Sequence, residues 1–438
     1  MLATAFRLSL ALALTGPGDP VPVSSSARLQ LLPDGLVKRQ FILDCTGCHQ
    51  FDAQVTQPDG APRSRDEWVA AVRRMLGFAG ATTGFPVIAA GRDPEATADW
   101  LSRELARAAS PASLPPPPAI GEAEVREYLM PEAGDLPHDV AVDGNGDVIV
   151  TGMFSHVMYR LDPVSGGFTT VALPAERGGP RAVEVDAGGA WWVLLGGPQL
   201  MARYAPATGT WKTWPMGMYP HSVALDSSGA AWFNGHFSRD PEVVGRIDPA
   251  TGGSTAFQVP LHPTMGTLPG GPVPYELRTG PDGRIWGSEL QGNRIFALTP
   301  ATGKFEIYPL PTPVSGPRRF DVAPNGDLWI PAYANNRLIR LEPASGKFTE
   351  YELPIPDALP YVARVDPARN VVWLGTGAAD AALSFDLTTK RFTVYPLPSQ
   401  GALVRHLSID PKTHDLWLAY GASPGRIPAR IARLRVTR

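Results

Sequence analysis

One short unit recurs seven times between residues 121 and 438, and this repeat restricts the fold more than any other feature of the chain. Each copy contains a hydrophobic residue, usually Trp, that follows a turn rich in Gly, Asp or Asn. Consecutive copies of this landmark lie 40 to 54 residues apart, a spacing typical of repeat architectures. The landmark residues are Ile149, Trp192, Trp232, Trp286, Trp329, Trp373 and Trp417.

The repeat predicts four short strands in each unit. A second landmark, such as residues 341–343, is followed by a Thr-Gly or Ser-Gly turn, and a strand ending in Leu-Pro comes last, as at residues 348–354. The chain has 45 Gly and 47 Pro but only 18% charged residues, which also favours short strands joined by tight turns. Seven such units predict a seven-bladed β-propeller over residues 121–438.

The sequence also predicts how the propeller closes. The last unit lacks its Leu-Pro strand, and a segment with that pattern precedes the first unit at residues 124–130. We expect this segment to complete the last blade, because a closed ring leaves no long sheet edge exposed. The recurring Trp, Tyr and Phe residues would then pack between blades.

Cysteine occurs only twice, in the pentapeptide CTGCH at residues 45–49. A disulfide framework needs more cysteines, and a structural zinc site needs two further ligands nearby, which this sequence lacks. Thioether bonds from Cys45 and Cys48 to a haem, with His49 as an iron ligand, account for all three residues. The motif therefore predicts one covalently bound haem c.

Residues 31–110 have helical spacing around this motif. Helical segments are expected at residues 36–42, 66–75 and 96–108, with acidic residues or a proline near two of the starts. Within 31–110, His49 is the only histidine and Met75 the only methionine, so elimination favours Met75 as the sixth iron ligand. A thioether opposite an imidazole suits electron transfer. Alternatively, Met75 fills core space, and the iron is five-coordinate.

This helical segment resembles a small class I cytochrome c domain. Trp68 followed by Met75 is similar to the Trp…Arg-Met segment in one group of such domains. The resemblance implies three helices around one haem. The expected fold class is therefore multidomain, with a small all-α cytochrome c domain at 31–110 followed by the all-β propeller.

The segments that flank the helices carry signals of their own. Within residues 1–30, Arg7 precedes the apolar stretch 8–14 and then small and turn residues, which is typical of a secretion signal, with a frayed N-terminus as the alternative. Because haem c is attached outside the cytoplasm, we expect a periplasmic or secreted protein. Residues 111–120 include four consecutive prolines and predict an extended linker.

The propeller repeats resemble those of the virginiamycin B lyase (streptogramin lyase) family, which share Asp-Gly-x-x-Trp and Tyr-x-Leu-Pro units. The resemblance implies catalysis by histidines in Pro-His strand starts, glutamates at the same mouth and a magnesium ion. His138 and His221 match the Pro-His starts, and Glu289 matches the Trp-Phe-Thr-Glu segment. The sequence departs from the family pattern at Val404-Arg405-His406 and at the strand starts that carry Arg181, Tyr275 and Arg318.

In a propeller, each innermost strand starts and the next strand ends at one face. Hairpin pairing places His221 opposite His236, and Tyr275 opposite Glu289 with Glu276 adjacent. Any one histidine also fits a loop or core position, but the cluster favours an anionic or polar substrate, or a magnesium or transition-metal ion held by imidazole and carboxylate. The expected catalytic residues are His138, His221, His236, Glu289 and His406, with His156 on the same rim.

Three functions remain open. The chain could be an electron-coupled oxidoreductase with its substrate or metal site at the mouth and a redox partner protein. It could instead be a metal-dependent carbon–oxygen lyase with an accessory cytochrome, or a non-catalytic electron carrier. We favour the first, because proton abstraction in a lyase needs no electrons.

Two classes of partner are disfavoured by composition. The net charge of -3 makes nucleic acid or an anionic membrane surface a poor partner. The sequence contains no apolar run long enough to span a bilayer. A small molecule is therefore the expected ligand of the mouth.

Overall fold

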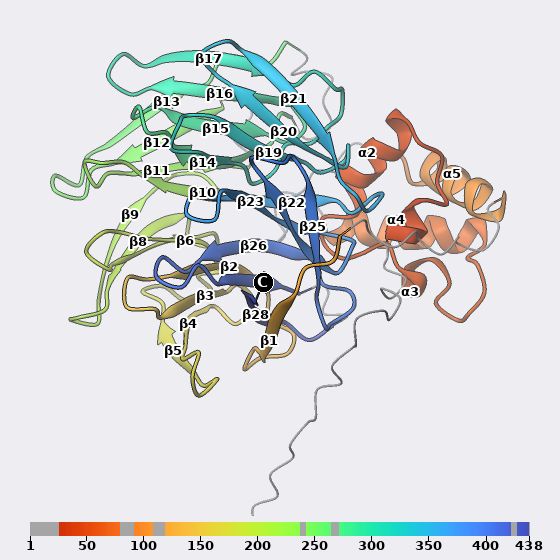
Figure 1. Cartoon of the computed structure of the whole chain (residues 1–438), viewed down its shortest axis with the longest axis horizontal. Helices are drawn as coiled ribbons and strands as arrows, with labels where there is room; N and C mark the ends of the chain where they lie inside the picture. The colour runs from red at the N-terminus through yellow and green to blue at the C-terminus, as the bar shows by residue number, and fades with distance from the viewer. Residues whose placement is uncertain are drawn as a thin grey trace, which may run out of the picture.

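The computed structural model describes residues 26–78, 92–107, 119–236, 242–263, 271–421 and 427–437. The predicted secretion signal at residues 7–18 and the four linker prolines lie outside these described residues. The described residues form a β-propeller with a helical domain against one side (Figure 1).

Seven antiparallel sheets of four strands each make up the propeller, which confirms the predicted number of blades. Blades 1 to 3 are β2 (Pro137–Val142), β3 (Val148–Gly152), β4 (Val157–Leu161), β5 (Phe168–Ala172); β6 (Pro180–Val185), β7 (Trp191–Leu195), β8 (Leu200–Ala205), β9 (Thr210–Pro215); and β10 (Pro220–Leu225), β11 (Ala231–Gly235), β12 (Val243–Ile247), β13 (Ser254–Gln258). Blades 4 and 5 are β14 (Pro274–Thr279), β15 (Ile285–Glu289), β16 (Arg294–Thr299), β17 (Lys304–Pro309); and β18 (Asp321–Val322), β19 (Leu328–Ala332), β20 (Arg337–Glu342), β21 (Lys347–Glu352).

Blade 6 contains β22 (Pro360–Asp366), β23 (Val371–Thr376), β24 (Ala381–Asp386) and β25 (Phe392–Pro396). Blade 7 contains β26 (Val404–Ile409), β27 (Leu416–Tyr420), β28 (Arg430–Val436) and β1 (Ala123–Leu129), the one strand that comes from before blade 1. β1 pairs with β28 and brings Tyr128 opposite Ile431, so the ring closes as the sequence predicts.

The recurring tryptophans fill the space within and between blades. Trp192, Trp232, Trp286, Trp373 and Trp417 are among the largest fully buried side chains. Trp192 stacks on Trp214 of its own blade and joins a core cluster with Phe233 of the next blade. These residues therefore stabilise the scaffold, as expected from their recurrence.

The helical domain contains α1 (Ser26–Leu29), α2 (Leu36–Cys45), α3 (Ala53–Thr56), α4 (Arg65–Phe78) and α5 (Pro94–Arg107). The three predicted helices correspond to α2, α4 and α5. A capping box starts α4: the Ser64 backbone N–H donates to the Glu67 carboxylate at 2.7 Å, and the Glu67 backbone N–H donates to the Ser64 hydroxyl at 3.4 Å. The Asp93 carboxylate caps α5 by accepting from the Glu95 backbone N–H at 2.9 Å.

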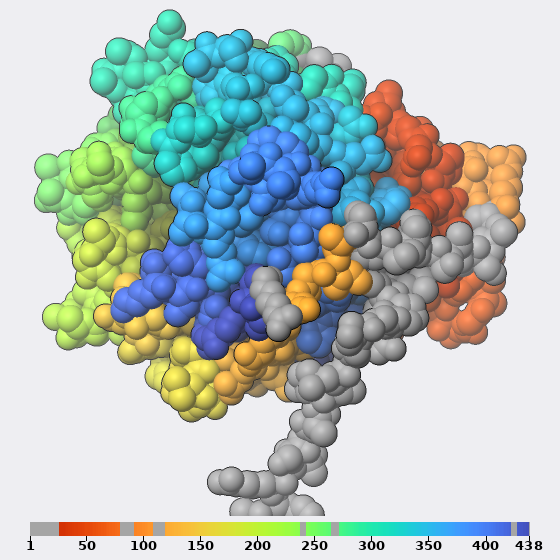
Figure 2. Space-filling view, viewed as in Figure 1, coloured from red at the N-terminus to blue at the C-terminus, as the bar shows by residue number. Residues whose placement is uncertain are grey.

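The two domains share one hydrophobic core, which corrects the expectation that a linker keeps them apart. A single cluster contains Phe41 and Trp68 of the helical domain together with Tyr275, Tyr333 and Tyr361 of the propeller. Figure 2 shows the helical residues in direct contact with the blades drawn in blue. The domains therefore pack as one unit.

The predicted domain boundaries also need correction at two points. Residues 1–30 were expected to be signal and flexible N-terminus, yet α1 lies within them, and the Ser26 backbone N–H donates to the Ala378 carbonyl oxygen of blade 6 at 3.0 Å. The end of the predicted linker also contacts the propeller, because the Val394 N–H of β25 donates to the Ala119 carbonyl oxygen at 2.9 Å. In both places backbone hydrogen bonds tie the chain to blade 6.

Candidate functional site

Seven buried side chains, one from each blade, form a ring at the face where the inner strands start. Each member comes directly after the residue that pairs with the end of the second strand of its blade. In blades 1 and 3, these pairs are Pro137 with Gly152 and Pro220 with Gly235. All seven are 4% exposed or less. We call this set the mouth ring: His138, Arg181, His221, Tyr275, Arg318, Tyr361 and Arg405.

Three of the predicted site histidines meet at the mouth ring. The rings of His221 and His236 lie 3.8 Å apart between centroids, but the β10–β11 register pairs Pro220 with Gly235, so the expected pairing of His221 with His236 across the hairpin is wrong. The His138 ring lies 5.7 Å from that of His221. His221 also contacts the Tyr275 ring at 4.3 Å.

Backbone carbonyls hold these imidazoles through Nδ1. The Nδ1 atoms of His138, His221 and His236 bond to the carbonyl oxygens of Arg181, Tyr275 and Pro274. Burial is the main cause that lowers the pKa of His138 to about 3 and places the pKa values of His221 and His236 well below the usual value. The three imidazoles are therefore neutral at physiological pH, with Nδ1 protonated and an Nε2 lone pair.

His406 directly follows Arg405, the mouth-ring member of blade 7, on β26. Its Nδ1 bonds to the Val140 carbonyl oxygen at 3.0 Å, and its Nε2 accepts from Arg364 Nη2 at 2.9 Å. His156 is different, because it is exposed on the rim, where its Nδ1 accepts from the Gly179 N–H at 3.2 Å. Four of the five expected histidines thus gather around the propeller axis, and His156 does not.

Glu289 does not share the contacts of the histidines, and its expected pairing is wrong. The β14–β15 register places Glu289 opposite Pro274 rather than Tyr275, because a bulge follows Pro274. The Glu289 carboxylate pairs with Arg294 at 2.7 Å. Burial is the main cause that raises the pKa of Glu242, and the negative charge of the neighbouring Glu289 carboxylate raises it further. This pair of carboxyls therefore belongs to the packing of blades 3 and 4.

Salt bridges across the propeller axis close the space below the mouth ring. Arg319 of blade 5 reaches Asp139 of blade 1 at 2.7 Å, and Arg364 of blade 6 reaches Glu276 of blade 4 at 3.1 Å. A third bridge joins Arg278 of blade 4 to Glu184 of blade 2 at 2.7 Å. Glu276, which the sequence places next to the site, therefore serves as a counter-charge in this floor.

The CTGCH segment covers the mouth ring from above. Arg405 donates to the carbonyl oxygens of Gly47 and Cys48 at 2.7 and 2.8 Å. Tyr333 donates to the Thr46 carbonyl oxygen at 2.9 Å. Arg318 lies close to Gly47, because a Cβ atom added at this glycine would lie 3.2 Å from Arg318 Nη2. Sequence reasoning missed Arg405 and Tyr333 as docking residues, although Arg405 occupies a strand-start position that the repeat identifies.

The motif residues that the sequence predicts to hold a haem lie at the end of α2 and directly after it. Both cysteines are free thiols, and burial raises the pKa of Cys45 to about 12 and also raises that of Cys48, so neither is a thiolate at neutral pH. Cys45 packs against the core that contains Phe41, Phe51 and Trp68. These three aromatic rings are 4% exposed or less and pack on one another.

The imidazole of the motif is held by the backbone. His49 Nδ1 bonds to the Gln50 carbonyl oxygen at 2.9 Å, which is the common way to orient a ligating imidazole through Nε2. Met75 is half-buried on α4. Residues 79–91, which follow α4, lie outside the described part of the chain.

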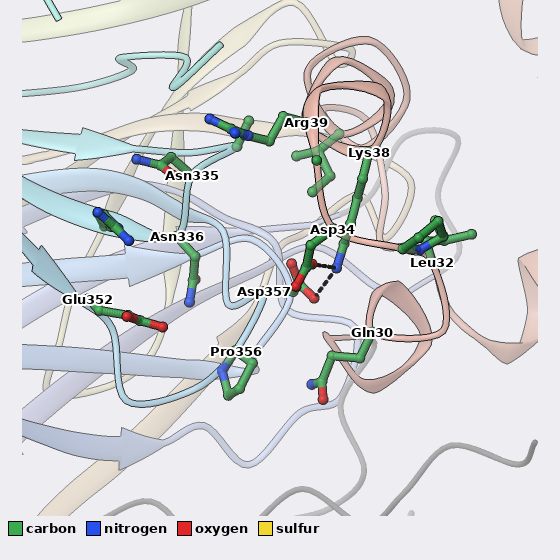
Figure 3. A pocket seen from close by; sticks show the side chains of 15 residues that line it. Gln30, Leu32, Asp34, Lys38, Arg39, Asn335, Asn336, Glu352, Pro356 and Asp357 are labelled. Atoms are coloured by element: carbon green, nitrogen blue, oxygen red, sulfur yellow. Dashed lines mark hydrogen bonds and ion pairs between the residues drawn. The ribbon is translucent and has the colours of Figure 1, made fainter. Parts of the chain in front are cut away.

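A polar groove marks one edge of the interface between the domains (Figure 3). It encloses about 610 Å³ between the start of α2 and blades 5 and 6. Lys38 crosses it and pairs with Asp34 at 2.9 Å and with Asp357 at 2.7 Å. Because Lys38 is only 3% exposed, this pair helps to fix the helical domain on the propeller.

No group of three or more His, Cys, Asp or Glu side chains is arranged to hold a metal ion in the described part of the chain. No helix within the same residues is long and apolar enough to cross a membrane. The predicted magnesium or transition-metal ion of the propeller therefore stays a prediction.

Comparisons with known proteins agree with the fold. The propeller shares its fold with a streptogramin B lyase (TM-score 0.63, 20% identity, 72% of this chain and 98% of that chain). A virginiamycin B lyase from Staphylococcus aureus gives a TM-score of 0.62 at 20% identity, over 72% of this chain and 99% of that chain. The hydrazine synthase of Kuenenia stuttgartiensis gives 0.55 at 14% identity, over 70% and 98%.

Sequence comparison is more selective. No curated protein matches the chain. Residues 267–430, which contain blades 4 to 6 and much of blade 7, match the virginiamycin B lyase family. The chain therefore contains a seven-bladed propeller that is similar to virginiamycin B lyases.

Proposed function

We propose that this chain is an exported c-type cytochrome with one haem, fused to a lyase-like propeller, and that it acts as an electron-coupled oxidoreductase. The observation that carries the proposal is the docking of the CTGCH segment on the mouth ring through Arg405 and Tyr333. A haem attached at Cys45 and Cys48 supplies one-electron exchange. A site for a small substrate and a site for electron exchange would then lie against each other.

The chain's own residues have defined tasks in this proposal. Arg405 and Tyr333 hold the haem-binding segment, and the Arg319–Asp139 pair closes the floor against water. His221 is buried, neutral and has no hydrogen-bond partner at Nε2 among the described residues. That nitrogen can accept a proton that a substrate loses during oxidation. The electrons would leave to a redox partner protein in the periplasm or outside the cell.

A substrate screen on the haem-loaded protein tests this function. Reduction of the haem by a small organic or inorganic substrate is expected, and the rate should fall by about 100-fold or more in His221→Gln, because general-base catalysis supplies that order of rate. His156→Gln is the matched control, since His156 is exposed on the rim. A His221→Gln protein that reduces its haem at the unaltered rate would contradict the assigned role.

A carbon–oxygen lyase is the second candidate, favoured by the family match over residues 267–430. Elimination needs only a base, a stabilised oxyanion and a positioned substrate. A full-length chain produced without haem should then cleave a streptogramin B with added Mg²⁺, and cleavage should be lost in His221→Gln. Against this candidate, the CTGCH segment covers the mouth ring, which leaves little access for a macrocyclic substrate.

Replacement of Met75 tests the sixth iron ligand. The Met75→Ala protein should lose the weak near-infrared sulfur-to-iron band completely and have a lower reduction potential, because a thioether ligand raises the potential. Optical spectroscopy and redox titration of the oxidised protein measure both. A spectrum equal to that of the unaltered protein would mean that Met75 only packs on α4.

A further inference from the structure

Three guanidinium groups of the mouth ring are buried without a carboxylate partner in the described part of the chain. Arg181 bonds to the Tyr219 hydroxyl at 2.7 Å and lies 3.3 Å from His138 Nε2. Arg318 bonds to the Tyr275 hydroxyl and lies 4.0 and 4.3 Å from the ring centroids of Tyr333 and Tyr361. Arg405 bonds to two backbone carbonyls. The mouth ring itself contains no acidic residue.

The other buried arginines around the axis are neutralised. Arg319 pairs with Asp139, Arg364 with Glu276, and Arg294 with Glu289. The protein therefore supplies carboxylates to buried guanidiniums on the floor and between blades, but not in the mouth ring. Burying an unpaired charge is costly, and such groups normally pair with an opposite charge.

Several polar atoms of the mouth ring also lack a hydrogen-bond partner among the described residues. They are Arg181 Nε, Arg318 Nε and Nη2, Arg405 Nε and His221 Nε2. These atoms come from four blades, and their side chains are 4% exposed or less. An anion with several oxygen atoms could accept hydrogen bonds from these three guanidinium groups and balance their charge.

We propose that the mouth ring binds a small carboxylate or other oxyanion through Arg181 and Arg318, beneath the CTGCH segment. The proposal names the substrate class of the site described above and rests on that proposed function for its role in catalysis. The covering segment restricts the anion to a small one. A haem propionate offers the same chemistry, and the experiment separates it from a free anion.

The pKa of Tyr361 reflects the same positive charge. Burial by itself raises the pKa of a phenol, yet Arg318, Arg405 and Arg319 together lower the pKa of Tyr361 to about 8. The guanidiniums of Arg318 and Arg405 thus favour a negative charge beside them.

Calorimetric titration of the haem-loaded full-length protein with oxalate at pH 7 tests the proposal. One oxalate per chain is expected to bind. Arg181→Gln and Arg318→Gln should each weaken binding by about tenfold or more, because charge-assisted hydrogen bonds are lost. Arg318→Lys should retain part of the affinity and guards against a misfolded glutamine variant. Arg203→Gln is the control, because Arg203 pairs with Asp186 in blade 2.

The outcomes separate the sources of the anion. If oxalate does not bind, but Arg318→Gln shifts the propionate-bending band in the resonance Raman spectrum, a haem propionate is the ligand. Absence of both oxalate binding and a propionate shift overturns the proposal. Oxalate binding that is equally strong in all variants also overturns it. Because binding is measured without turnover, failure of the oxidoreductase assignment leaves this test intact, and the reverse also holds.

Discussion

Replacing Cys45 and Cys48 together with alanine should yield a full-length chain that carries no covalently bound haem. The sequence contains no other cysteine, so no other thioether bond to a porphyrin can form. The expected loss is complete. Extraction with acidified acetone, followed by haem absorbance of the protein pellet, measures it after expression with the cytochrome c maturation machinery. Thr46→Ala is the matched control within the same pentapeptide and should retain haem.

The double variant should still fold, which keeps the result interpretable. The propeller holds this segment through the backbone carbonyls of Gly47 and Cys48 and through the shared core around Phe41, none of which needs a thiol. Circular dichroism should therefore show an unaltered β-sheet signal. Haem that survives extraction from the folded double variant would refute the assignment.

The blades could be predicted because their signals are local. A turn followed by a Trp-containing strand fixes a hairpin, and the missing last strand identifies the closing segment at the N-terminal side. The His221 and His236 rings do meet, but the strand register pairs Pro220 with Gly235 and Pro274 with Glu289. In both blades a bulge lies between the strand start and the hairpin, so counting residues from the turn does not give the pairing at the strand start.

The docking of the helical domain could not be predicted in the same way. It depends on contacts between residues hundreds of positions apart, such as Arg405 with Gly47 and Tyr333 with Thr46. The four prolines of the linker suggested a spacer, whereas burial of Phe41 and Tyr361 in one core decides the arrangement. The aligned strand starts would have revealed the mouth ring, since six of its seven members follow a proline.

The mouth ring and its floor use charge in opposite ways. Below, every buried guanidinium that crosses the axis meets a carboxylate, as Arg319 meets Asp139. Above, Arg181 and Arg318 face neutral phenols and imidazoles. The floor is therefore built for stability, whereas the ring keeps an uncompensated positive charge beside the segment that would carry the haem. That asymmetry is what makes the ring a candidate for ligand binding rather than for structural support.

The free energy of unfolding should fall steeply as the pH drops below about 6.5. Burial lowers the pKa values of His138, His221, His236 and His406, so the folded chain keeps four imidazoles neutral. The unfolded chain protonates them at the ordinary histidine pKa and thus binds more protons, which means that stability is lost as the pH falls. Each histidine contributes about 1.4 kcal/mol per pH unit below that pKa.

Buried carboxyls with raised pKa values act in the opposite direction over the same range. Burial raises the pKa of Asp380 to about 6 and raises that of Glu242, so these groups bind protons in the folded chain first. Burial also raises the pKa values of Glu184, Glu289, Asp44 and Asp357, so these carboxyls offset part of the loss that the histidines cause. Urea unfolding at several pH values measures the slope. His221→Gln should reduce the histidine contribution to this slope by about 1.4 kcal/mol per pH unit, and a slope that is unaltered in His221→Gln would contradict a neutral His221 imidazole in the fold.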